Sequence, residues 1–280
     1  MEHEANVAKD QRTIASLFPT YARDIWGGSK DERNCLRIAD ELVARLGPST
    51  LVHKITSLEV EKLTADLKRA GNKPRTINTK LTRLSKLLKK ARRMKVLDVI
   101  PEIELPKVGE GRIRFLTPQE EYALFAALPE PYKALSTFLL YTGCRVGEAL
   151  ALTWADVSQT HVTFWVTKSG KPRTVPLMKA SREAIPWHRS GDLIRPFGNI
   201  RYEAFIIAWH KAKATTTMAA DPQVIPHVLR HTCASRLVQS GIDIRRVKDW
   251  LGHSTLDMTL RYAHLAPNDL DLAARALERS

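Results

Sequence analysis

The first hundred residues carry apolar side chains at the spacing of α-helices. Over residues 36–46 they recur every three or four positions, and Gly47-Pro48 ends the run. A second helix is predicted over residues 56–67, and a Gly-Asn-Lys-Pro breaker at residues 71–74 follows it. A long third helix is predicted over residues 76–94 because leucines and one isoleucine repeat along it. The first half is therefore predicted to be almost entirely helical.

The pattern of the second half begins with a helix start. Thr117-Pro118-Gln119-Glu120 combines a capping box with a proline at the first helical position, and the helix is predicted to run to about Leu128. Two further helices are predicted over residues 132–141 and 145–152. Gly143, between them, suits the left-handed turn that ends a helix.

Residues 161–167 change the period. Apolar and polar side chains alternate there as in a β-strand, residues 169–172 suit a turn, and residues 173–177 form the partner strand. Helices resume near residues 202 and 226, and over residues 243–251 and 254–263. The predicted fold is mainly α with a small antiparallel β-hairpin, an α+β protein.

A break in the pattern separates the two halves. Residues 101–111 contain two prolines, two glycines and no periodicity, which predicts a linker. We expect a helical domain over residues 1–105 and a second domain over residues 112–280. Residues 1–110 and residues 111–280 each have 22 Lys or Arg and 15 Asp or Glu, so both halves are positively charged.

Composition narrows the class of protein. The chain has 280 residues, 44% of them hydrophobic, which is enough to form cores. A net charge of +14 favours a polyanionic partner, nucleic acid before an anionic membrane. The sequence has no run of 18 apolar residues, and its polar start is unlike a signal peptide, so we expect a cytoplasmic protein. Three scattered cysteines, Cys35, Cys144 and Cys233, are expected to be reduced thiols.

The long helix of the first half has an unusual charge. Residues 68–95 contain twelve Lys or Arg and no Asp or Glu. A solvated helix face normally mixes signs, so a surface that contacts phosphates is the better interpretation, although an ordinary exposed face is the alternative. The candidate DNA-binding side chains are Arg75, Lys80, Arg83, Lys86, Lys89, Lys90, Arg92 and Arg93.

Two cations of the second half stand in separate motifs. Arg145 follows a helix-ending glycine, near the free backbone donors of a helix start, and Glu148 could orient its guanidinium. A simple surface pair of Arg145 with Glu148 is the alternative. Lys168 lies where a strand enters the hairpin turn, a place where exposed basic residues are common. Lys171 and Arg173 compete with it for any role.

The helix near residue 227 begins with a His-Val-Leu-Arg-His segment. His227 and Arg230 share one helix face, and His231 lies four residues after His227. That spacing allows a metal site completed by Cys233 and His253. Val228, where a zinc protease has glutamate, and the repulsive charge of Arg230 disfavour it.

His253 and Tyr262 end the series. His253 follows Gly252, where an imidazole could cap helix carbonyls instead of acting in chemistry. Tyr262 could be an inert core tyrosine with one hydrogen bond. For each of these two residues taken by itself, the sequence leaves open both a structural role and a chemical role.

Taken together, these residues resemble the tyrosine recombinase, or phage integrase, family. The family's catalytic domain has an Arg after Thr-Gly, a Lys in a hairpin, a His-x-x-Arg helix, a His or Trp after Leu-Gly, and a Tyr about nine residues on. In family order these fall on Arg145, Lys168, His227, Arg230, His253 and Tyr262. The resemblance is close over residues 111–265 and looser over residues 12–100, which look like a core-binding domain. Val228 departs from a frequent Asp.

The resemblance implies a mechanism. Tyr262 would attack a DNA phosphodiester and form a 3′-phosphotyrosine, with His227 as proton acceptor and Lys168 as general acid. Arg145, Arg230 and His253 would bind the phosphate oxygens, with Glu148 and His231 in support. No metal or other cofactor is implied.

The resemblance also implies partners. Exchange between two duplex recombination sites needs four cuts, so a homotetramer on DNA is expected, with accessory DNA-bending or directionality factors possible. An apolar stripe at Leu270, Ala273, Ala274 and Leu277 suits a tail that docks on a neighbouring protomer or on its own domain. An integrase of a phage or mobile element is favoured. The alternatives are a cellular resolvase, a type IB topoisomerase, a non-catalytic DNA-binding relative and a zinc hydrolase.

Overall fold

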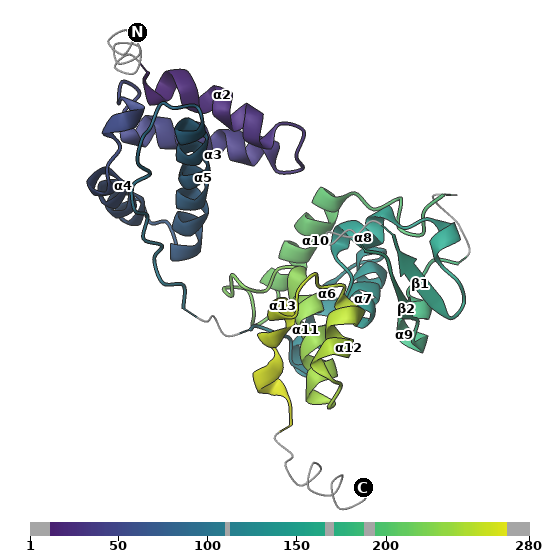
Figure 1. The fold of residues 1–280 in the computed structure, drawn as a ribbon. Helices are drawn as coiled ribbons and strands as arrows, with labels where there is room; N and C mark the ends of the chain where they lie inside the picture. The colour runs from purple at the N-terminus through teal and green to yellow at the C-terminus, as the bar shows by residue number, and fades with distance from the viewer. Residues whose placement is uncertain (1–11, 110–112, 166–170, 188–193, 268–280) are drawn as a thin grey trace, which may run out of the picture. The chain divides into compact units, whose positions relative to one another are not determined.

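The chain folds into two compact units, residues 1–110 and residues 111–280 (Figure 1). The computed structural model describes residues 12–109, 113–165, 171–187 and 194–267. Within these residues the chain is mainly helical and has one two-stranded antiparallel sheet, so the predicted fold class is confirmed. No helix of this described part is long and apolar enough to cross a membrane.

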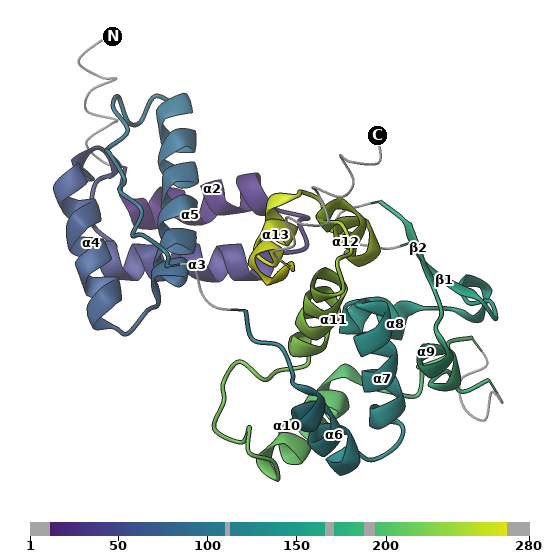
Figure 2. The ribbon, with the colours of Figure 1, turned by 90° about the horizontal axis from the view of Figure 1, so that it is seen from below.

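The first unit is a bundle of helices. They are α2 (Ile14–Trp26), α3 (Glu32–Leu46), α4 (Ser57–Arg69) and α5 (Pro74–Arg93), with a 3₁₀ turn η1 (Val52–Lys54). Helices α2, α3 and α5 pack against one another, and α4 packs against α5 (Figure 2). The apolar positions that predicted α5 are fully buried, because the leucine stripe of this helix faces the other three.

Part of the predicted linker is attached to this first unit. Ile103 packs against the core of the bundle. Two hydrogen bonds hold the segment: the Glu102 N–H donates to Ser57 Oγ at 3.2 Å, and Asn78 Nδ2 donates to the carbonyl of Pro106 at 2.9 Å. The lack of periodicity in residues 101–107 therefore reflects an extended segment that covers α4 and α5.

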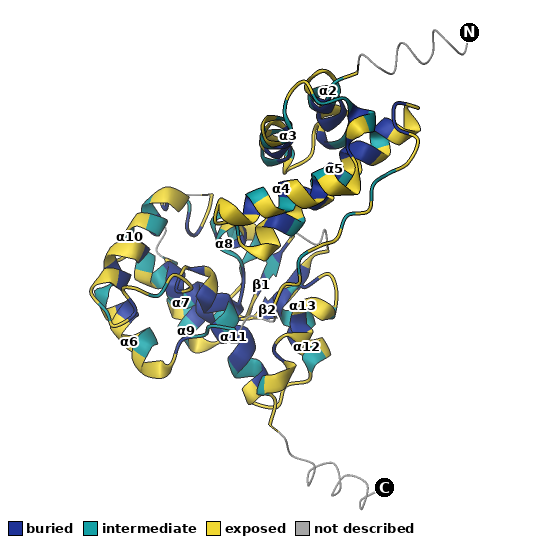
Figure 3. Ribbon diagram, turned by 90° about the vertical axis from the view of Figure 1, so that its left-hand side faces the viewer, coloured by how far each residue is buried: buried dark blue, intermediate teal, exposed yellow. Residues whose placement is uncertain are grey.

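The second unit is built around α7 (Tyr132–Thr142) and α11 (His227–Gln239), which pack together. Helix α11 is dark blue along much of its length in Figure 3, because other elements surround it. The remaining helices are α6 (Pro118–Ala127), α8 (Val146–Ala151), α9 (Lys179–Glu183), α10 (Tyr202–Ala214), α12 (Ile244–Leu251) and α13 (Asp257–Leu260). Single turns of 3₁₀ helix are η2 (Trp154–Asp156) and η3 (Ala263–Leu265).

The hairpin consists of β1 (His161–Phe164) and β2 (Arg173–Pro176), which pair in antiparallel register with Phe164 opposite Arg173. Val162 and Phe164 of β1 are buried on the same side as Arg173 and Val175 of β2. The alternation in the sequence predicted both strands, since successive side chains of a strand point to opposite faces.

One helix is shorter than its sequence predicts. A helix over residues 254–263 was expected, but α13 has four residues, and Tyr262 lies in the turn between α13 and η3. So short a helix is marginal by itself, and tertiary contacts decide where it ends. Tyr262 belongs to a small buried apolar cluster with Val238 of α11 and Leu251 of α12, which holds this turn on the body of the unit.

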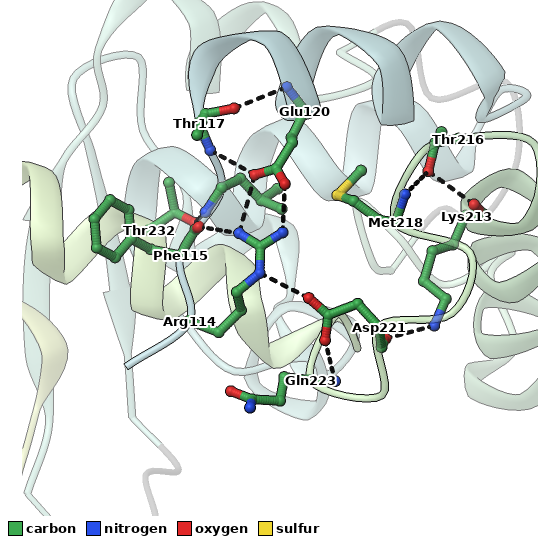
Figure 4. A network of polar contacts seen from close by, with 11 residues as sticks. Arg114, Phe115, Thr117, Glu120, Lys213, Thr216, Met218, Asp221, Gln223 and Thr232 are labelled. Carbon is green, nitrogen blue, oxygen red and sulfur yellow. Dashed lines mark hydrogen bonds and ion pairs between the residues drawn. The ribbon is translucent and has the colours of Figure 1, made fainter. Parts of the chain in front are cut away.

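A polar network fixes the start of the second unit (Figure 4). Arg114 donates to both carboxylate oxygens of Glu120 and, through Nε, to Asp221 at 2.8 Å. Lys213 of α10 donates to the carbonyl of Asp221 at 2.8 Å. The network joins the first residues of this unit to the first turn of α6 and to the loop that leads into α11.

We predict that Arg114→Leu lowers the free energy of unfolding by about 1–3 kcal/mol, because two partly buried carboxylates lose their hydrogen bonds. Urea unfolding is the measurement. The matched control is Glu183→Gln, whose ion pair with Lys179 is long, at 4.0 Å, and exposed. It should change stability by less than about 0.5 kcal/mol. Equal stability of Arg114→Leu and the wild-type chain would contradict a structural role for the network.

Candidate active site

Arg145 stands at the junction of α7 and α8. Helix α7 ends at Gly143, whose φ of 63° is left-handed, and a Cβ there would lie 3.0 Å from the Cys233 sulfur. Only glycine fits this tight turn. The chain then starts α8, and Glu148 accepts from the backbone N–H of Arg145 at 3.0 Å and from its guanidinium at 2.8 Å. Glu148 therefore orients Arg145, as the sequence indicated.

Glu148 has a second arginine partner, Arg173 of β2. The two side chains are 2.7 Å apart and both are buried. Burial alone would raise the pKa of Glu148, but hydrogen bonds and the charge of Arg173, with help from Arg145, hold it below its usual value. Glu148 is thus ionised, and it joins α8 to the hairpin.

Arg173 also connects the hairpin to the end of α12. Its Nε donates to the carbonyl of Trp250 at 3.1 Å, and its guanidinium lies over the ring of Phe164. Gly252 ends α12 with a φ of 68°, and a Cβ there would lie 2.8 Å from Arg173 Cδ. From the sequence, Arg173 was expected only as a competitor of Lys168 for a role at the hairpin. The alternation of β2, which puts it beside buried Val175, was the available signal.

Arg230 is the most deeply held cation of the site, with an exposed fraction of 3%. It donates to the carbonyls of Gly143 and Leu251, each at 2.7 Å, and so ties α11 to the ends of α7 and α12. Burial and the charges of Arg145 and Arg173 lower the pKa of Arg230 to about 10, which leaves it charged at neutral pH. Its hydrogen-bond partners are backbone carbonyls. Among the described residues, no carboxylate accepts a hydrogen bond from it.

These contacts concentrate positive charge. Two guanidinium groups, those of Arg145 and Arg173, share the carboxylate of Glu148, and their charges also act on the guanidinium of Arg230. A buried positive charge is costly unless an anion approaches it. The cluster is therefore suited to bind a phosphate.

His253 lies beside this cluster, buried behind Gly252. Its Nδ1 is 2.8 Å from the hydroxyl of Thr259, so Nε2 is the ring nitrogen that can reach a ligand. Burial and the charges of Arg230 and Arg145 lower the pKa of His253 to about 3. The ring is neutral at physiological pH.

Tyr262 is buried, and His231 is its polar contact. The hydroxyl of Tyr262 lies 2.6 Å from His231 Nδ1. Burial raises the pKa of Tyr262 to about 12 and lowers that of His231 to about 4. The sequence pointed to His227 as the proton acceptor, but the phenol contacts the histidine one turn further along α11.

His227 faces a pocket instead. The pocket has a volume of about 440 Å³, and Arg145, His227 and Arg230 contribute to its wall. Its other side comes partly from α10, through Tyr202, Ile206 and His210. Burial, followed by the charge of Arg230, lowers the pKa of His227. Five of the six predicted catalytic residues therefore lie on elements that α11 brings together.

Lys168, the sixth, lies outside the described residues. The zinc alternative finds no support in the described part of the chain, where no three His, Cys, Asp or Glu side chains converge on a metal position. His231 faces Tyr262 and His253 faces Thr259. Cys144 and Cys233 are buried, and burial raises the pKa of each thiol to about 12, so both stay protonated.

The basic side chains of α5 divide into two groups. Lys80 is buried and contacts Glu41 at 2.6 Å, Arg83 contacts Asp31 at 2.8 Å, and Lys90 contacts Asp24 at 2.9 Å. These acids come from α2, α3 and the turn between them, which the run of residues 68–95 could not reveal. The exposed basic side chains are those of Arg75, Lys86, Lys89, Arg92 and Arg93.

We predict that the free energy of unfolding falls as the pH is lowered from about 6.5 to about 4. In the unfolded chain both histidines become protonated over this range. In the folded chain His231 and His253 stay neutral, because their pKa values are about 4 and about 3, so a lower pH favours the unfolded state. Each residue contributes a slope of at most about 1.4 kcal/mol per pH unit. His231→Gln and His253→Gln should each show a shallower decline in urea unfolding. Slopes equal to that of the wild-type chain would contradict the burial argument.

Comparison with known proteins gives the site a family context. The sequence matches the phage integrase family over residues 114–269. The integrase of Haemophilus phage HP1 (strain HP1c1) is 35% identical over 192 residues, which cover 67% of this chain and 54% of the relative. The integrase of Salmonella phage P22 is 32% identical over 231 residues, which cover 74% of this chain and 59% of the relative. The chain thus spans between half and three fifths of the length of these relatives.

A solved structure shares the fold. A lambda integrase tetramer bound to a Holliday junction matches with a TM-score of 0.75 at 18% identity, over 90% of this chain and 77% of that chain. At this identity the likeness concerns the fold alone. The family match covers more than half of the sequence and includes Arg145, His227, Arg230, His253 and Tyr262. The chain belongs to the phage integrase family.

Proposed function

We propose that this chain is a site-specific DNA recombinase that cuts and rejoins strands through a 3′-phosphotyrosine at Tyr262. The observation that carries the proposal is a cluster of three guanidinium groups with a single carboxylate among them, together with a tyrosine whose hydroxyl contacts a neutral histidine. A phosphodiester supplies the negative charge that such a cluster lacks, and the phenol supplies a nucleophile.

Each cation has a role in this proposal. Arg145 and Arg230 bind the non-bridging oxygens, whose negative charge grows in the transition state. Arg173 and Glu148 hold Arg145 in place, and His253 donates from Nε2 to a phosphate oxygen. Lys168 remains the predicted general acid for the departing 5′-oxygen, since a shielded lysine readily changes its pKa.

The exposed basic face of α5 is proposed to contact the DNA backbone. Arg75, Lys86, Lys89 and Arg93 fall on one side of the helix, since they are separated by 11, 3 and 4 residues. Within the described part of the chain none of the four forms an ion pair. They remain available to phosphates, whereas Lys80, Arg83 and Lys90 are occupied by Glu41, Asp31 and Asp24.

The biological setting is proposed from the relatives. Phage integrases, those of phages HP1 and P22 among them, match this chain, which favours integration or excision of a phage or mobile element in a bacterial cytoplasm. The lambda integrase of the matched structure is a tetramer on a Holliday junction, and we propose a homotetramer on duplex recombination sites here. Accessory DNA-bending or directionality factors, and docking by the tail with Leu270 and Leu277, which lies outside the described residues, belong to the same proposal.

We predict that the chain forms a covalent adduct with a nicked suicide substrate, and that Tyr262→Phe abolishes it because the nucleophilic hydroxyl is lost. The substrate carries a duplex site that the chain itself selects from a random library, and denaturing gel electrophoresis detects the adduct. Tyr122→Phe, at a tyrosine that is 78% exposed, is the matched control and should react like the wild-type chain. An adduct that persists in Tyr262→Phe would overturn the nucleophile. Relaxation of supercoiled DNA without any site would favour a topoisomerase.

A second prediction concerns the basic face of α5. The double variant Lys86→Ala/Lys89→Ala should reduce the slope of log affinity against log salt by about 1.8, because each lost phosphate contact removes about 0.9. Fluorescence anisotropy with labelled duplex DNA measures the slope. Lys179→Ala, a lysine that is 81% exposed on α9, is the control and should leave it unchanged. A double variant with the wild-type slope would remove this face from the DNA interface.

A further inference from the structure

We propose that His231, and not His227, is the general base that takes the proton of Tyr262 during strand cleavage. The proposal rests on the proposed function and adds a catalytic residue to it. The decisive contact is the 2.6 Å separation between His231 Nδ1 and the Tyr262 hydroxyl, two atoms that lie 31 residues apart in the sequence. A base must lie within hydrogen-bond reach of the proton that it removes, and this distance is well within that reach.

The fold gives His227 and His231 different neighbours. His227 and His231 are one turn apart on α11, with ring centroids 4.8 Å apart and planes nearly perpendicular. His227 lines the pocket together with Arg145 and Arg230. The ring of His231 lies 5.9 Å from that of Tyr262. His227 is thus directed to the phosphate and His231 to the nucleophile.

The step balances in protons and electrons. A lone pair of the Tyr262 oxygen forms the bond to phosphorus, and the phenolic proton moves to His231 Nδ1. The tautomer required has the neutral ring protonated at Nε2. The bond from phosphorus to the 5′-oxygen breaks, and the leaving oxygen keeps the electron pair and receives a proton from the general acid, predicted to be Lys168. In the reverse step a 5′-hydroxyl attacks phosphorus and gives its proton to the deprotonated general acid. The bond from phosphorus to the Tyr262 oxygen breaks, and His231 returns its proton to that oxygen.

The surroundings suit a base that holds a proton only briefly. His231 is partly buried on α11, and nearby charges include those of Arg230 and Arg261, which oppose a lasting imidazolium. Without a phosphate the proton therefore stays on the phenol. Transfer accompanies attack, when the phenolic oxygen gives electron density to phosphorus and becomes more acidic. A base of this kind releases its proton readily, as a reversible exchange of strands requires.

His231→Asn separates this role from mere positioning. An asparagine amide can still hydrogen-bond the Tyr262 hydroxyl, but it cannot take up a proton. The test is single-turnover cleavage of the selected suicide substrate, made with either oxygen or sulfur at the 5′-bridging position. Sulfur is a good leaving group and needs no general acid, so it isolates activation of the nucleophile from protonation of the leaving group.

We expect His231→Asn to cleave the oxygen substrate at least about 100-fold more slowly than the wild-type chain, with no recovery on the sulfur substrate. Lys168→Ala is the comparison, and its loss should be recovered by sulfur. Cleavage by His231→Asn within about threefold of wild type, or recovery on sulfur, would overturn the base assignment. If the wild-type chain forms no adduct with either substrate, the proposed function is wrong, and the role of His231 as its general base is then wrong as well.

A second variant keeps the proposal testable if His231→Asn does not fold. His231→Ala is assayed with and without added imidazole, which can occupy the space left by the side chain. Recovery of cleavage by imidazole supports a proton-transfer role, and the recovered rate should vary with the pKa of substituted imidazoles, which a purely structural role would not show. Absence of recovery in His231→Ala, with recovery in His227→Ala, would assign the base to His227.

Discussion

The burial of Arg230 is the constraint on which the rest of this site depends. An arginine that is 3% exposed must satisfy its donors within the protein, and Arg230 donates to the carbonyls of Gly143 and Leu251. These carbonyls are available because α7 and α12 both end there in left-handed glycine turns. One side chain thus fixes the ends of two helices, and its charge is left for an anion.

Helix α11 carries this arrangement because its successive side chains serve different neighbours. His227 faces the pocket, Arg230 holds α7 and α12, and His231 contacts the phenol of Tyr262. Thr232 accepts the backbone N–H of Leu116 at 2.9 Å, near the point where Arg114 fixes the start of the unit. A helix that is buried along most of its length can do this, since its side chains point in every direction around the helix axis.

The basic helix α5 shows a limit of charge patterns along a sequence. Twelve cations without one acid suggested a continuous phosphate-binding surface. In the folded unit, acids from other segments reach Lys80, Arg83 and Lys90, and the exposed cations form a narrower stripe. A charge count covers one segment of the chain. It cannot reveal ion pairs with acids that are distant in the sequence and close in space.

The sequence by itself determined the local features of this protein. Helical and strand periods, the capping box at Thr117, the glycine turns at Gly143 and Gly252, and the order of the chemical residues all depend on neighbours within a few positions. It also indicated that Glu148 orients Arg145, three residues away. Only the tertiary structure decided which distant groups meet: Arg173 with Glu148, Arg230 with two helix ends, and His231 with Tyr262. Those contacts join segments 21 to 87 residues apart, and packing of the whole unit sets their geometry, so no local pattern could have separated His227 from His231 as the partner of Tyr262.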